Sequence, residues 1–246
     1  MDPSYGREYR ELYRHHWWWR VREGEILREI RTLRPPSGWH HLLDIGCGDG
    51  LFFDQLTRFG TVEGIEPDSA LLDPAGKWRS AIHAVPFDER FQPPHRFDVI
   101  LMLDVLEHLE DPEQALRHAV RLLAPGGYVL CTVPALQWIW TRHDDLNRHF
   151  RRYDRHSLRA LARAAGLDIL RERYLFQWLV GAKLLLRGME RLVPGEPSPP
   201  GIPPRPLNAF LKVVTTIEQR INRVVSMPFG SSLLVVGRPT DVKATP

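Results

Sequence analysis

The sequence predicts an α/β fold built on a mostly parallel sheet. From residue 41 onward, short apolar runs alternate with segments of helical spacing. The apolar runs show little polar–apolar alternation, as expected when helices cover both faces of a sheet. The chain has 246 residues, of which 43% are hydrophobic. A chain of this size can bury a substantial core, most simply as one domain.

The elements of the first half follow in a regular order. A helix is expected over residues 7–34, before Pro35 and Pro36 end it. Strands are expected at residues 41–45, 61–66, 81–85, 97–103 and 128–133, with helical segments opening at Leu51, Pro67 and Asp111. Asp111 and Pro112 are typical of a helix start, because aspartate caps the first turn and proline fits the first helical position.

The second half is organised differently. Helices are expected at residues 154–165, 175–192 and 207–225, and strands at 167–174 and 231–236. Seven prolines among residues 194–206 predict an extended connection. We divide a single domain of residues 1–246 into a cap helix (1–36), a core (37–174), a helical insertion (175–228) and a last strand with its tail (229–246).

The glycine-rich segment after the first strand carries the strongest functional signal. A strand that runs into such a turn and then a helix lets a ligand approach the backbone. Glu66 ends the next strand, 20 residues past Gly46, where a carboxylate can accept hydrogen bonds from ribose hydroxyls. The spacing is GxGxG, because Leu51 stands where a dinucleotide fingerprint has its third glycine. Asp44 and Asp49 would repel a pyrophosphate but favour a cationic ligand.

Together with residues 97–111 and 123–133, residues 42–50 and Glu66 resemble the class I S-adenosylmethionine (SAM)-dependent methyltransferase family. The resemblance covers roughly residues 15–174 and the last strand. It implies a Rossmann-like sheet of seven mostly parallel strands in which the last strand is antiparallel. The family often joins its last two strands by a short hairpin, whereas about 50 residues intervene here.

The resemblance also implies a site for SAM, which leaves as S-adenosylhomocysteine. Gly46, Gly48 and Gly50 would line the methionine part, Asp44 would hold the start of the loop, and Glu66 would bind the ribose hydroxyls. The other expected cofactor residues adjoin these or follow later strands, with Phe87 and Asp88 flanking the adenine: Cys47, Pro67, Phe87, Asp88, Leu103, Asp104 and Val105.

Asp104, Glu107 and His108 are similar to the acidic–acidic–histidine cluster of some metal-assisted O-methyltransferases of the ubiquinone pathway. Hard oxygen ligands and one imidazole can hold a divalent ion. Side chains that bond local backbone at a helix start explain the same residues, and on this interpretation no metal is expected.

Three successive tryptophans, Trp17 to Trp19, lie in the first helical segment. They point about 100° apart on a helix, so one buried face cannot hold all three. The family resemblance suggests that this aromatic helix closes over the SAM site, with Trp18 beside the cofactor and Arg22 reaching its carboxylate. Core packing of the tryptophans is the alternative.

The segment after the fifth strand is dense in histidine, arginine and aromatic residues. Ligands of α/β proteins bind at the carboxyl ends of the strands. Methyl transfer from SAM is an in-line displacement that depends on positioning, and an oxygen acceptor also loses a proton to a base. We expect His149, and after it His143, to be that base. The expected acceptor-binding residues are Trp138, Arg151, Arg152 and Tyr153, and a solvated basic helix start is the alternative.

Charge is segregated along the chain. Residues 1–141 carry a net −6, residues 142–174 a net +4 and residues 175–246 a net +5, which together give +3. This segregation favours an anionic or membrane-surface acceptor. Residues 175–192 form a basic amphipathic pattern, which suits a peripheral membrane contact, a lid over the acceptor or an oligomer contact.

These observations predict a methyltransferase that acts on a small-molecule or carrier-linked acceptor at oxygen. We expect it in the cytoplasm, peripheral to the inner membrane surface if residues 175–192 bind lipid. Residues 1–13 show no signal peptide, and Cys47 and Cys131 form neither a disulfide framework nor a CxxC site.

Three other functions stay open at this point. They are a non-catalytic SAM-fold scaffold, a nucleic-acid methyltransferase and an NAD-dependent oxidoreductase. The GxGxG spacing disfavours the oxidoreductase. Residues 133–135 lack an Asn-Pro-Pro-Tyr-type signature, so no nucleic-acid partner is expected.

Overall fold

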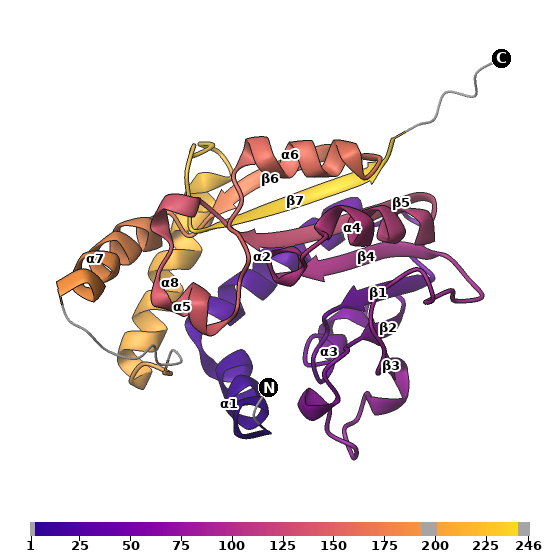
Figure 1. Ribbon diagram of the computed structural model, residues 1–246, viewed down its shortest axis with the longest axis horizontal. Coiled ribbons are helices and arrows are strands. Elements are labelled where there is room, and N and C mark those ends of the chain that lie inside the picture. Colours follow the sequence, from indigo (N-terminus) through magenta and orange to yellow (C-terminus); the bar gives the residue numbers. More distant parts are fainter. Residues whose placement is uncertain (1–2, 193–200, 241–246) are drawn as a thin grey trace.

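The computed structural model describes residues 3–192 and 201–240. One sheet crosses the centre of the molecule (Figure 1). Its strands are β1 (His41–Ile45), β2 (Thr61–Ile65), β3 (Ile82–His83), β4 (Phe97–Leu103), β5 (Leu123–Pro134), β6 (Leu167–Leu175) and β7 (Ser232–Pro239). Their order is β3-β2-β1-β4-β5-β7-β6. Strands β1 to β5 run parallel, and β7 is antiparallel to both of its neighbours. The predicted Rossmann-like fold with an antiparallel last strand is confirmed.

Helices cover both faces of this sheet. They are α1 (Pro3–His15), α2 (Trp17–Leu33), α3 (Phe53–Leu56), α4 (Pro112–Leu122), α5 (Arg142–Leu146), α6 (Arg155–Ala164), α7 (Trp178–Leu192) and α8 (Arg205–Asn222). In β4, Ile100 shares one buried cluster with Leu116 of α4 and Leu158 of α6. Its neighbour Leu101 shares the other cluster with residues of α2 and α3, such as Phe53. Because successive strand residues point to opposite faces, both must be apolar here, which explains the unalternated apolar runs.

The helix predicted over residues 7–34 is wrong in one respect, because it is interrupted at His16. There the backbone is extended, with φ −73° and ψ 131°, and His16 Nδ1 accepts a hydrogen bond from the Trp18 amide at 3.2 Å. His16 therefore caps a new helix, although no proline or glycine marks the break in the sequence. The interruption separates α1 from α2.

The segments between β1 and β3 contain less helix than the sequence predicts. Helix α3 has four residues, and Ser69–Leu71 forms only a 3₁₀ turn. Aspartate side chains compete for the backbone here: Asp68 Oδ1 accepts from the Ala70 amide, and Asp73 Oδ1 accepts from the Ala75 amide. Such local bonds favour turns over helix.

The helical insertion joins β6 to β7 and consists of α7 and α8. Both helices lie to the left of the sheet in Figure 1. Of the proline-rich connection, residues 194–200 lie outside the described residues, as do residues 241–246 of the tail, and residues 201–204 have no regular structure. Among the helices of the described ranges, none has the length and apolar character needed to cross a bilayer. The proposed division into segments stays a prediction.

Candidate functional site

The loop after β1 is held in a conformation that only glycine adopts easily. Gly46, Gly48 and Gly50 have φ values of +71°, +53° and +67°. A Cβ atom on Gly46 would lie 2.8 Å from Cγ2 of Val105, the residue that follows β4 by two positions. Glycine at these positions therefore brings bare backbone to the carboxyl ends of β1 and β4.

Glu66 fastens this loop to the end of β2. One carboxylate oxygen accepts from the Gly48 amide at 3.0 Å and the other from the Asp68 amide at 2.9 Å, on the far side of Pro67. Burial raises the pKa of Glu66, while these two hydrogen bonds act in the opposite direction. A carboxylate can accept about four hydrogen bonds, so capacity for further donors remains.

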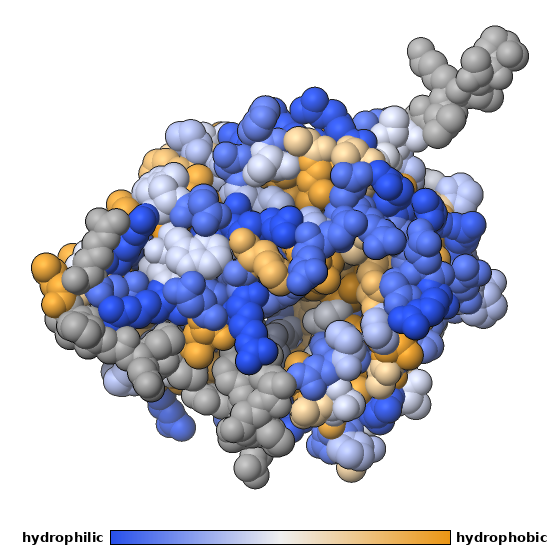
Figure 2. Space-filling view, viewed as in Figure 1, coloured by the Kyte–Doolittle hydropathy of each residue, from blue (hydrophilic) through white to orange (hydrophobic). Residues whose placement is uncertain are grey.

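A cleft opens beside the loop. Its walls come from the ends of β1 and β4 and from both N-terminal helices: Tyr9, Tyr13, Trp19, Arg22, Glu23, Ile26, Asp44, Gly46, Cys47, Leu51, Phe52 and Leu103. Figure 2 shows this face of the molecule hollowed near its middle. Burial raises the pKa of Asp44 to about 7, although nearby Arg22 lowers it. The cleft thus combines carboxylates with aromatic rings, a lining that suits a cationic ligand with a flat ring.

Arg22 links the N-terminal cover to the ends of β4 and β5. Its guanidinium lies 2.6 Å from Asp104 Oδ2 and donates to Thr132 Oγ1 at 3.0 Å. Its buried Nε has no hydrogen-bond partner among the described residues. Trp18 lies 5.3 Å from the guanidinium and stacks on Phe176. Trp19, and not Trp18, is among the residues that line the cleft.

Helix α1 contributes contacts that the sequence did not suggest. Arg10 forms an ion pair with Asp49 in the glycine loop at 2.5 Å, and the ring of Tyr9 meets Trp19 edge-on at 6.1 Å. These contacts hold α1 across the cleft. The sequence signal for these contacts was the spacing of Tyr9 and Tyr13, which are four residues apart and therefore share one helix face.

The placement of Phe87 and Asp88 beside the adenine stays a prediction. They line a second depression with residues of the α4 region, such as Asp111 and His118, and neither lines the first cleft. Asp88 is half-buried, and hydrogen bonds from Arg90 lower its pKa to about 2.

The acceptor-side segment is organised around a buried carboxylate, Asp144. The same oxygen, Oδ1, accepts from His149 Nδ1 and from Arg152 Nε, each at 2.9 Å, and Oδ2 accepts from the Thr141 amide. Burial alone would raise the pKa of Asp144, but His149 and Arg152 outweigh burial and hold it below its usual value. Asp144 is therefore an anion that orients His149.

The two histidine candidates differ in their surroundings. The side chain of His149 is 10% exposed, and its ring packs edge-on against His108 with centroids 4.7 Å apart. His143 Nε2 lies 3.0 Å from the Asn147 amide nitrogen, and burial lowers the pKa of His143 to about 4. Of the two histidines in this described segment, only His149 is joined to Asp144 through a ring nitrogen.

Glu107 is a fully buried acid beside these histidines. Neither carboxylate oxygen has a partner of normal hydrogen-bond geometry among the described residues, and burial raises its pKa well above the usual value. The ligand atoms of Glu107, His108 and His149 lie within 4.8 Å of one another, so this group could hold a divalent ion. Asp104 is not in this group and pairs with Arg22 instead.

The four predicted acceptor-binding residues are not equivalent. Arg152 and Tyr153 are buried, and their polar groups have internal partners: Arg152 bonds Asp144 and the Ala135 carbonyl, and the Tyr153 hydroxyl donates to the Leu106 carbonyl. Arg151 donates to the Glu110 carbonyl, and Trp138 is 50% exposed. The structure thus gives Arg152 and Tyr153 contacts inside the protein and leaves Arg151 and Trp138 on the surface.

The sequence of the chain matches those of known methyltransferases. A family model described as a methyltransferase domain matches residues 8–172. The ubiquinone biosynthesis O-methyltransferase of Paracidovorax citrulli is 32% identical over 149 residues, which cover 52% of this chain and 60% of the relative. The enzyme of that name from Pseudomonas entomophila is 28% identical over 192 residues, 65% of this chain and 81% of the relative. The chain thus spans about 60% of the length of the first relative.

Solved structures agree on the fold. A SAM-dependent methyltransferase from Archaeoglobus fulgidus superposes with a TM-score of 0.57 at 15% identity, covering 93% of this chain and 97% of the other. One from Clostridium acetobutylicum gives 0.56 at 10% identity, covering 90% and 92%. The sequence match, which takes in the glycine loop, Glu66 and the cleft, identifies the chain as a member of the class I SAM-dependent methyltransferase family.

Proposed function

We propose that this protein transfers the methyl group of SAM to an oxygen of a small-molecule or carrier-linked acceptor, with His149 as the base. The observation that carries the proposal is the His149–Asp144 pair, at 2.9 Å, beside His108 in the turn that follows β4. A carboxylate bonded to one ring nitrogen leaves the other nitrogen to take a proton. The names of the relatives, ubiquinone biosynthesis O-methyltransferases, support an oxygen acceptor and suggest an intermediate of ubiquinone biosynthesis.

The residues of the cleft fit SAM. A Cβ atom on Gly46 would fill space beside Val105, and the buried Arg22 Nε is a donor that a ligand carboxylate can use. Asp44 lines the cleft, and a bound sulfonium cation would favour the charged form of its carboxyl group. When bound, SAM supplies a methyl group made electrophilic by its sulfonium.

The contributions of the protein are then positioning and proton removal. Asp104 and Arg22 fix the N-terminal cover over the carboxyl ends of β4 and β5. His149 Nε2 would take the proton of the acceptor hydroxyl, because Asp144 already occupies the other ring nitrogen. Asp144 stabilises the imidazolium that results.

The test is turnover of methyl-labelled SAM with a prenylated catechol, against the same compound with its hydroxyls already methylated. We expect labelled product and S-adenosylhomocysteine from the catechol alone. Calorimetry with SAM is the parallel measurement, and Glu66→Ala should weaken binding. A protein that does not bind SAM, or that binds it equally well without Glu66, contradicts the proposal; binding without turnover of any hydroxyl acceptor favours a non-catalytic scaffold.

We further propose that α7 and α8 lie on an anionic membrane surface. Two charged residues of α7 contact α5 and the turn before it: Glu190 accepts from the Arg142 amide, and Arg187 donates to the Trp138 carbonyl. Burial lowers the pKa of Lys183 to about 8. The outer face of α7 is apolar: Leu184, Leu185, Leu186, Met189 and Leu192 are exposed.

Helix α8 is arranged in the same way. Its inner face is polar, with Asn208 bonded to the Trp17 amide, Thr215 to Trp178 Nε1, and Asn222 to the Tyr174 carbonyl. Its exposed apolar residues form one stripe, which Val224 continues just past the helix: Leu207, Phe210, Val213, Val214, Ile217 and Ile221. Figure 2 shows hydrophobic residues gathered at the left end of the molecule, over α7.

The charges at this surface suggest lipid as the occupant. In the described parts of α7 and α8, the exposed charged residues are all cationic: Arg205, Lys212 and Arg220. Apolar side chains flanked by cations suit an anionic bilayer surface, where each cation contributes about 1 kcal/mol.

Vesicle flotation tests this surface. We expect binding to vesicles that contain phosphatidylglycerol, weaker binding to pure phosphatidylcholine, and at least a tenfold loss for Phe210→Glu with Ile217→Glu, because charge is costly at the bilayer. Ala160→Glu with Ala164→Glu, on the exposed face of α6, adds the same charge and should bind normally. A stable dimer by ultracentrifugation without vesicle binding would instead make a second copy the occupant.

A further inference from the structure

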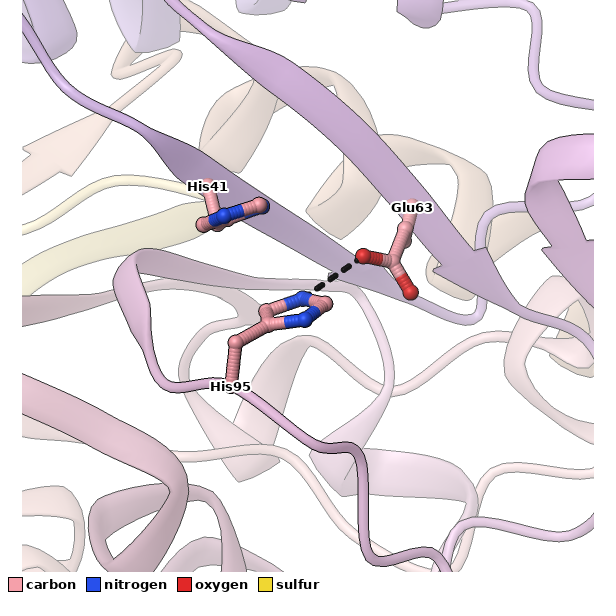
Figure 3. Close-up of side chains that lie close together, drawn as sticks. All are labelled: His41, Glu63 and His95. Atoms are coloured by element: carbon pink, nitrogen blue, oxygen red, sulfur yellow. Dashed lines mark ion pairs between the residues drawn. The ribbon is translucent and has the colours of Figure 1, made fainter.

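A second group of chemically active side chains lies away from the cleft. Figure 3 shows His41, Glu63 and His95 gathered beside the sheet. His41 is the first residue of β1, Glu63 is the middle residue of β2, and His95 lies in the loop that leads into β4. His41 thus begins the strand whose other end carries the glycine loop, so this group is separate from the proposed methyl-transfer site.

The three side chains present ligand atoms to one small volume. One nitrogen of each imidazole and one oxygen of Glu63 all lie within 4.8 Å of one another. His95 Nε2 is 2.7 Å from Glu63 Oε1, and the rings of His41 and His95 stack with centroids 4.0 Å apart and 23° between their planes. All three residues are half-buried, which reduces competition from water.

Ordinary hydrogen bonding does not account for this arrangement. His41 Nδ1 is buried and has no hydrogen-bond partner among the described residues, and His95 Nε2 is buried without a bond of normal geometry despite its closeness to Glu63. Protonating both imidazoles would place two like charges in stacked rings. A cation bound between the lone pairs satisfies both nitrogens and the carboxylate together.

We propose that His41, Glu63 and His95 bind a zinc ion. Two imidazoles and one carboxylate form a ligand set that Zn²⁺ favours, at about 2.0–2.2 Å from each atom. Neighbouring ligands of a tetrahedral ion then lie about 3.3 Å apart. The present spacings, from 2.7 Å to at most 4.8 Å, bracket that value, so side-chain rotation suffices. With three protein ligands, the fourth position holds water.

His83 completes the environment of the ion. Its Nε2 lies 3.0 Å from Glu63 Oε2, the oxygen that does not face His95. Such a partner fixes the orientation of a ligating carboxylate. The ion would therefore join β1, β2 and the end of β3 to residues 84–96, the loop that carries His95 and also Phe87.

The role that this position indicates is structural. The site lies outside the cleft, and its ligands come from two strands and one long loop. Binding to the folded state alone stabilises that state, in proportion to the logarithm of free ion over dissociation constant. Zinc should therefore raise the melting temperature of the protein.

Zinc titration of chelator-treated protein, with a competing indicator dye and with melting curves, tests the proposal. We expect one ion to bind at this group and to raise the melting temperature. Glu63→Gln and His95→Gln should each weaken that binding by more than 100-fold, and His83→Gln by roughly 10- to 100-fold. Glu63→Gln keeps the shape of the side chain, and circular dichroism checks that each variant is folded.

Two controls separate this site from other histidines. His156→Gln removes an exposed imidazole on α6, and His108→Gln removes one from the group near His149. Both variants should keep the ion and the rise in melting temperature. If Glu63→Gln and His95→Gln bind zinc as tightly as the unaltered protein, or if the unaltered protein binds none at micromolar concentration, the proposal is wrong.

Discussion

Replacing His149 by glutamine should lower kcat by about 100- to 10,000-fold, the usual contribution of a positioned general base. The reason is geometric: Asp144 holds Nδ1 of His149 at 2.9 Å, so the ring is fixed and its other nitrogen is left for the acceptor proton. Affinity for SAM should stay the same, because His149 is not among the residues that line the cleft. Steady-state kinetics and calorimetry measure the two quantities separately.

The matched control is His143→Gln. Burial already lowers the pKa of His143 to about 4, so its ring is uncharged and weakly basic near neutral pH. It also lies beside the Asn147 amide. We expect this variant to keep most of its kcat. Equal losses in both variants, or a full rate without His149, would exclude His149 as the base.

Replacing Arg152 by methionine should destabilise the protein by about 3–5 kcal/mol, the typical cost of removing one partner of a buried ion pair. The Arg152 side chain is 2% exposed and Asp144 is fully buried. Without the guanidinium, the Asp144 carboxylate keeps His149 and Thr141 but loses its charged partner, and the Ala135 carbonyl loses a donor. Methionine fills similar volume, so the lost charge dominates.

Urea unfolding of the variant measures this change, with Arg151→Met as its neighbour control. Arg151 bonds the Glu110 carbonyl at the surface, so its loss should change the free energy of unfolding little. Arg151→Met should instead weaken the use of an anionic acceptor. An Arg152→Met protein as stable as the unaltered one would show that Asp144 does not depend on this pair.

The glycine loop and the strands of the sheet could be predicted because their signals are local. Apolar runs, a GxGxG turn and an acid at the next strand end each occupy a few consecutive residues. The burial of Arg152 could not be predicted from such local signals. Its sequence context is that of Arg151, and only contacts with residues 8 and 17 positions away make one arginine internal and leave the other at the surface.

The face that a helix buries is equally hard to predict from one segment. The period of residues 175–192 indicates an amphipathic helix, but Glu190 turns inward because it meets Arg142, 48 residues earlier. His41, Glu63 and His95 likewise form no motif, since three separate segments bring them together. The break at His16 depends on a side chain that caps the next helix, and no proline or glycine announces it.

The position of β7 between β5 and β6 has a consequence for the order in which the chain assembles. During synthesis β6 leaves the ribosome before β7, its neighbour in the described sheet, exists. Strands β1 to β5 can pair first, while β6, α7 and α8 wait for Ser232–Pro239. In that interval α7 and α8, with their outward apolar stripes, have already been synthesised. A lipid surface could therefore engage these helices before the last strand closes the sheet.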